Sequence, residues 1–137
     1  MNDSILNELS IKLCELGKRM NFHKVFVRSD RYTTEIYVMN KHALQIEIDW
    51  QENNLFMYVV YLKNEVLPDK NVIYSYEEGQ WCRKFLEEVY KTKRPQTKDS
   101  NRRYSLEHLI DCFEFYMKLI NSNPTILAEF CKSIDSV

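Results

Sequence analysis

Glycine and proline are scarce in this chain, which has only two glycines and three prolines among 137 residues. Loops that cradle phosphates with backbone N–H groups need several closely spaced glycines, and neither Gly17 nor Gly79 belongs to such a loop. The Gly-x-Ser-x-Gly elbow of hydrolases and the signature motifs of protein kinases are also absent. These absences exclude the commonest nucleotide-binding and hydrolytic machineries.

Paired cysteines are lacking too, because the four cysteines occur singly at positions 14, 82, 112 and 131. Zinc ribbons and thioredoxin-like sites need a Cys-x-x-Cys pair. The three histidines, His23, His42 and His108, are scattered, whereas zinc needs three or four convergent ligands. The sequence therefore predicts no metal site and no other cofactor.

No hydrophobic run is long enough to cross a bilayer, since the longest covers only residues 55–62. The first residues lack the basic start and apolar run of a signal peptide. The net charge of −1 produces no overall field toward nucleic acid or a membrane. We therefore expect a cytoplasmic protein that binds no membrane, and the composition disfavours nucleic acid as a partner.

Hydrophobic periodicity predicts the fold. Apolar residues spaced by three and four predict an amphipathic helix over 4–20. The period then changes to two, which predicts short strands at 25–27, 32–38 and 44–50, separated by polar turns. Residues 55–62 are apolar on both faces, which is typical of a strand in the centre of a sheet.

Helical spacing returns in the second half of the chain, over 80–91, 105–121 and 124–134. Ser105 and Asn123 are suited to cap the second and third of these helices, and Pro124 to begin the last one. Strands grouped apart from helices favour an α+β fold over an alternating α/β fold. We expect one domain over 1–137, with an N-terminal helix, a four-stranded antiparallel meander and three C-terminal helices packed on the sheet.

Charge and aromatic residues are unevenly distributed. Residues 44–90 hold nine acids and four bases, and residues 91–103 hold six bases and one acid. Aromatic residues near acids are typical of protein interfaces, whose anchors are Trp, Tyr and Arg. The predicted partner-binding residues are Glu47, Asp49, Trp50, Tyr74, Tyr76, Glu77, Glu78, Trp81, Arg102 and Arg103.

Two pairs of residues are candidate catalytic groups. Glu47 and Asp49 project from one face of a predicted strand, where Glu35 joins them if the sheet faces are consistent. Paired carboxylates bind cations or transfer protons, but a solvated face is the simpler interpretation. His108 and Cys112 are four residues apart on a helix, yet no orienting third group accompanies them, so we expect packing and no catalytic residue.

In general character the chain resembles small bacterial accessory proteins such as the immunity proteins of toxin systems. The resemblance lies in its size, its missing catalytic motifs and the acidic, aromatic region 47–81. It implies a compact, non-enzymatic domain that binds another protein, such as a toxin. Two alternatives remain: a small enzyme or ligand-binding domain with an acidic pocket between the sheet and the late helices, and a homodimer formed through the sheet near 55–62.

Overall fold

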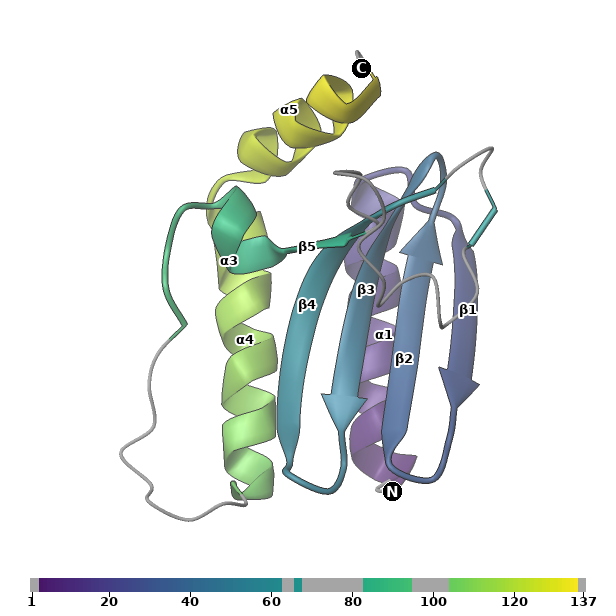
Figure 1. The fold of residues 1–137 in the computed structure, drawn as a ribbon, viewed down its shortest axis with the longest axis vertical. Helices are drawn as coiled ribbons and strands as arrows, with labels where there is room; N and C mark the ends of the chain where they lie inside the picture. Colours follow the sequence, from purple (N-terminus) through teal and green to yellow (C-terminus); the bar gives the residue numbers. More distant parts are fainter. Residues whose placement is uncertain (1–2, 63–65, 68–82, 95–103, 136–137) are drawn as a thin grey trace, which may run out of the picture.

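The computed structural model describes residues 3–62, 66–67, 83–94 and 104–135, and it has the α+β fold that the sequence predicts (Figure 1). Five antiparallel strands form one sheet in the order β1-β2-β3-β4-β5. The strands are β1 Lys24–Ser29, β2 Thr33–Met39, β3 His42–Asp49, β4 Asn54–Tyr61 and β5 Arg83–Phe85. The helices are α1 Asp3–Arg19, α3 Leu86–Val89, α4 Leu106–Ser122 and α5 Pro124–Asp135.

Helix α1 ends in a hydrogen-bonded turn that redirects the chain into the sheet. The N–H of Phe22 donates to the carbonyl of Gly17 at 2.7 Å, and Asn21 has a φ of 62°. This is the pattern of a Schellman C-cap, in which one residue adopts the left-handed conformation. A Cβ on Gly17 would lie 2.9 Å from the carbonyl oxygen of Phe22, so the close approach favours glycine here.

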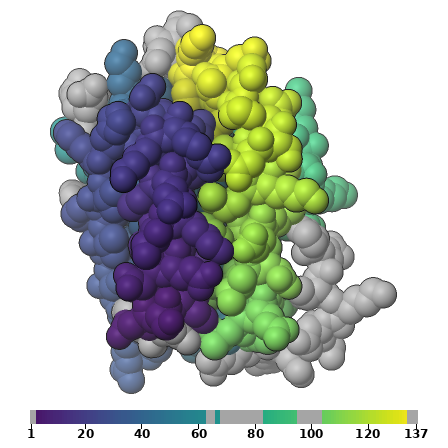
Figure 2. All heavy atoms as spheres, turned by 180° about the vertical axis from the view of Figure 1, so that it is seen from behind, coloured from purple at the N-terminus to yellow at the C-terminus, as the bar shows by residue number. Residues whose placement is uncertain are grey.

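One face of the sheet is covered by α1 and α4, which lie side by side when the molecule is seen from behind (Figure 2). Leu9, Leu13 and Leu16 of α1 belong to the same buried cluster as Leu109 and Phe113 of α4. Alternate residues of β2, β3 and β4 complete this cluster: Ile36, Val38, Leu44, Ile46, Ile48, Leu55, Met57 and Val59. Helix α5 packs against α4 and α3.

A second buried cluster lies on the opposite face of the sheet. It contains Tyr37, Ala43, Tyr58, Val60 and Leu62, with Phe85 packed against it. Strand β4 is therefore buried on both faces and lies inside the sheet between β3 and β5, as its apolar sequence predicts, although β3 is the central strand.

The predicted helix over 80–91 is wrong in its described part. Arg83–Phe85 is a fifth strand paired with β4, and only Leu86–Val89 is helical. The apolar spacing that suggests one helix has two sources: Phe85 packs on the second face against Tyr58, with ring centroids 4.7 Å apart, whereas Leu86 and Val89 join the helix-covered core.

Candidate functional site

Three of the predicted partner-binding residues lie in the described structure, and all three have structural partners. Trp50 is 8% exposed and donates from its indole N–H to the hydroxyl of Thr34 at 2.8 Å. One carboxylate oxygen of Asp49 accepts hydrogen bonds from the N–H groups of Gln51 and Glu52, which shapes the β3–β4 turn. Glu47 is half-buried in an ion pair with Arg83.

The other seven predicted residues lie outside the described residues. They are Tyr74, Tyr76, Glu77, Glu78, Trp81, Arg102 and Arg103. That all ten residues form one surface therefore stays a prediction.

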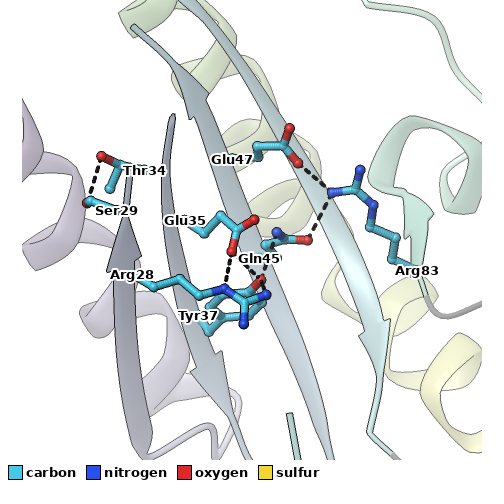
Figure 3. A network of polar contacts seen from close by, with 8 residues as sticks. All are labelled: Arg28, Ser29, Thr34, Glu35, Tyr37, Gln45, Glu47 and Arg83. Carbon is cyan, nitrogen blue, oxygen red and sulfur yellow. Dashed lines mark hydrogen bonds and ion pairs between the residues drawn. The ribbon is translucent and has the colours of Figure 1, made fainter. Parts of the chain in front are cut away.

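A chain of polar contacts crosses the second face of the sheet, as Figure 3 shows. Glu35 is 1% exposed and pairs with Arg28 of β1, while the Tyr37 hydroxyl donates to the same carboxylate at 2.9 Å. The amide of Gln45 donates to the Tyr37 hydroxyl at 3.0 Å and accepts from Arg83 at 3.3 Å. Arg83 also pairs with Glu47. The network thus links β1 at one end of the sheet to β5 at the other.

The register confirms that Glu35, Glu47 and Asp49 share one face, because Glu35 lies opposite Glu47 and Thr33 lies opposite Asp49. They do not form a free carboxylate cluster, however, because Arg28 and Arg83 each neutralise one carboxylate. Among the described residues, no group of three or more His, Cys, Asp or Glu side chains could hold a metal ion. The polar groups of this face therefore stabilise the pairing of strands and are poorly suited to acid–base chemistry.

His108 and Cys112 do meet on α4, with 3.4 Å between Nε2 and Sγ. Arg94 donates to the same sulfur and lies over the ring of Phe56, 4.3 Å from its centroid. Burial raises the pKa of the Cys112 thiol, and the nearby Arg94 lowers it only in part. Because a thiolate is the reactive form, this buried neutral thiol is a poor nucleophile. The cluster attaches the chain after α3 to α4.

The feature that sequence reasoning missed is the exposure of strand β1, whose presence at 25–27 the sequence predicts. Val25, Phe26 and Val27 are 49%, 43% and 46% exposed, although they are three consecutive apolar residues in a strand. The register places Val25 and Val27 on the helix-covered face, opposite Val38 and Ile36, and Phe26 on the second face, opposite Tyr37. The sequence shows three consecutive apolar residues between Lys24 and Arg28, which indicate a strand but do not reveal whether its side chains are buried or exposed.

The backbone of β1 also offers hydrogen-bonding groups at the end of the sheet. The N–H of Asp30 donates to the carbonyl of Thr33, so these two residues form a hydrogen-bonded pair at the turn between β1 and β2. Along an antiparallel pair of strands, hydrogen-bonded residue pairs alternate with pairs that are not hydrogen-bonded to each other. The N–H and C=O groups of Phe26 and Arg28 therefore point toward β2, and those of Val25 and Val27 point away from it. An extended segment could pair with these outward groups and contact the exposed side chains at the same time.

Within the part of the chain that the structure describes, no helix is both long and apolar enough to span a membrane. In comparisons with known proteins, no family model, curated protein or solved structure matches the chain at a significant level. The function must therefore be argued from the geometry of the sheet and its exposed first strand.

Proposed function

We propose that this chain is a non-catalytic protein-binding domain and that β1 is the strand on which its partner docks. The observation that carries the proposal is the exposure of Val25, Phe26 and Val27 on the first strand of the sheet. Proteins normally protect such edges with charges, prolines, bulges or very short strands, because an apolar edge pairs with other chains. A strand with exposed apolar side chains at the end of a sheet is suited to strand addition by a partner.

The enzyme or ligand-pocket alternative finds no comparable support. It required Glu47, Asp49 and His108 to line one pocket. Glu47 is paired on the second face with Arg83, whereas His108 is on α4 beside Cys112. Two hollows at the described surface, one beside α5 and one along α4, are lined by none of these three residues.

The homodimer alternative placed its seam near 55–62. In the structure five of the eight β4 residues are buried, and β5 pairs with β4 at Tyr58, Val59 and Val60, so a second copy would have to displace β5 to pair with this part of the strand. The most concrete version of our proposal remains an accessory protein that binds a toxin, as the immunity-like character of the sequence implies.

Replacing Val27 by proline tests the proposal directly. Proline removes the backbone N–H that points away from β2, and it is tolerated on edge strands whose N–H faces outward. The tagged wild-type chain, Val27→Pro and Val27→Thr serve as parallel baits in a lysate of the source cells. Val27→Thr is the matched control, because it keeps both the N–H and the β-branched shape.

The proposal expects a partner that is retained by the wild-type chain and by Val27→Thr, with about tenfold or greater loss of affinity for Val27→Pro. Circular dichroism and thermal melting confirm that all three baits are folded. A toxin-like protein encoded beside this chain is tested in the same way, by neutralisation. Retention of the same proteins by all three baits, or of none by the wild-type chain, contradicts the proposal.

A further inference from the structure

The surroundings of β1 are basic, although the whole chain has a net charge of −1. Residues 18–42 contain six bases and only two acids. Both acids have partners: Asp30 accepts hydrogen bonds from the N–H groups of Tyr32 and Thr33, and Glu35 pairs with Arg28. The other bases are Lys18, Arg19, Lys24, Arg31 and Lys41. None of them has an ion pair among the described residues.

A hollow of about 340 Å³ adjoins the segment that leads into β1. It lies between the end of α1, the β2–β3 turn and α5, and Figure 2 shows α5 beside the end of α1. Three cations line it, and no acid does. These cations are Arg19, Lys41 and Lys132, and the apolar part of the lining includes Met20, Phe22 and Ala128. This hollow is suited to a carboxylate side chain with an apolar neighbour.

We infer that β1 pairs with an extended, acidic segment of another protein, whose apolar side chains contact Val25, Phe26 and Val27 and whose acidic end enters the hollow between α1 and α5. This inference rests on the proposed docking function and adds the chemistry of the partner. Opposite charge raises the association rate and excludes wrong partners, while the exposed apolar residues and the outward backbone supply contact.

The charge of β1 disfavours a second copy of this chain as the occupant. Residues 24–31 carry Lys24, Arg28 and Arg31 against a single acid, Asp30, so two such strands bring like charges together. The outward N–H and C=O groups of Val25 and Val27 disfavour nucleic acid in turn, because it offers no strand of alternating amide donors and acceptors for them to pair with.

Synthetic peptides of twelve residues test the inference with the chain as it is. One peptide alternates Val and Glu, a neutral control alternates Val and Ser, and a basic control alternates Val and Lys. Each carries a fluorescent label, and a labelled oligothymidine of twelve nucleotides is the fourth probe. Fluorescence anisotropy gives their affinities at low and at high salt, with wild type and with two variants.

The variants separate backbone pairing from charge. Val27→Pro blocks the outward N–H, and the double variant Arg19→Glu/Lys41→Glu reverses two cations of the hollow. We expect the Val–Glu peptide to bind about tenfold more tightly than the Val–Ser peptide, with a difference that shrinks at high salt. Val27→Pro should weaken Val–Glu binding about tenfold. Charge reversal should weaken Val–Glu binding by a similar factor and change Val–Ser binding less than about twofold.

Several results would overturn the inference. They are no binding of the Val–Glu peptide to the wild-type chain, tighter binding of the Val–Lys peptide or the oligothymidine, and a dimer in sedimentation that Val27→Pro abolishes. If the Val–Glu and Val–Ser peptides bind equally and Val27→Pro weakens both, the inference of an acidic partner is wrong. The proposal that a partner docks on β1 would still stand. The docking function is decided separately by the capture experiment with the natural partner.

Discussion

The two edge strands of the sheet, β1 and β5, are each held by an arginine–glutamate ion pair, but they differ in how far they are exposed to solvent. Arg28 attaches β1 to Glu35, and Arg83 attaches β5 to Glu47, both across the second face of the sheet. Strand β5 has only three residues, all half-buried, and continues into α3 with Leu86 fully buried. Strand β1 has six residues, five of them exposed. A short, covered strand resists unwanted pairing, whereas a longer, exposed strand invites pairing.

The difference follows from where the helices pack. Helix α1 contacts β2, and α4 contacts β4, so the covered part of the helix face extends over the inner strands. Val25 and Val27 lie on the same face beyond this cover and remain about half exposed. The position of α1 therefore leaves β1 available to a partner.

The largest effect that separates the two ends is a loss of packing. Leu86→Ala should lower the free energy of unfolding by about 3 kcal/mol, because it leaves a cavity beside β5. Val27→Ala should cost less than about 1 kcal/mol, since its side chain is half exposed and only strand propensity changes. Urea unfolding measures both values. Equal losses in the free energy of unfolding for the two variants would show that β1 is covered to the same extent as β5.

The two ion pairs should also differ. Glu35→Gln removes a carboxylate that is 1% exposed from an arginine that is 24% exposed, and it should cost about 2–3 kcal/mol. Glu47→Gln changes a carboxylate that is 19% exposed, and Arg83 keeps its hydrogen bond to Gln45, so about 1 kcal/mol is expected. Urea unfolding of the two variants measures this ranking, and a larger loss for Glu47→Gln would contradict it.

Raising the pH should lower the free energy of unfolding through Tyr37 and Tyr58, which lie beside the two ion pairs. Burial, more than the neighbouring carboxylate, raises the pKa of the phenols of Tyr37 and Tyr58 above their usual value near 10. The unfolded chain therefore loses these protons first: the stabilisation is complete below pH 10 and is lost as the pH rises above it. Each phenol should account for about 1 kcal/mol at pH 10.5.

Urea unfolding at pH 9 and pH 10.5 measures this loss, and Tyr58→Phe is the control that removes the titrating group at the β5 end. Its decrease in stability between the two pH values should be smaller than that of the wild-type chain. An unchanged decrease in this variant would rule Tyr58 out as a contributor.

Much of the sheet could be predicted from the sequence, because period-two alternation and polar turns define β2, β3 and β4 locally. Alternation also placed Glu35, Glu47 and Asp49 on one face. Strand β5 could not be predicted, since three residues carry too little periodicity and the adjoining Leu86 and Val89 continue a helical spacing. Its existence depends on pairing with β4, which is a tertiary contact.

The candidate site was harder to predict than the fold. Trp50 fits an interface by residue type, but its N–H finds Thr34 inside the structure. Val25 and Val27 fit a core by residue type, yet they lie beyond the cover of α1, and Phe26 on the opposite face is exposed too. In both cases exposure depends on which elements pack over the strand, and residue type alone does not determine it.

The central claim is that the outward edge of β1 pairs with a partner, and amide hydrogen exchange at Val27 tests it most directly. In the free chain the N–H of Val27 should exchange faster than that of Phe26, which points toward β2. When the captured partner binds, exchange at Val27 should slow by about tenfold or more, while exchange at Ile36 stays unchanged. A saturated complex in which Val27 exchanges as fast as in the free chain would contradict the account.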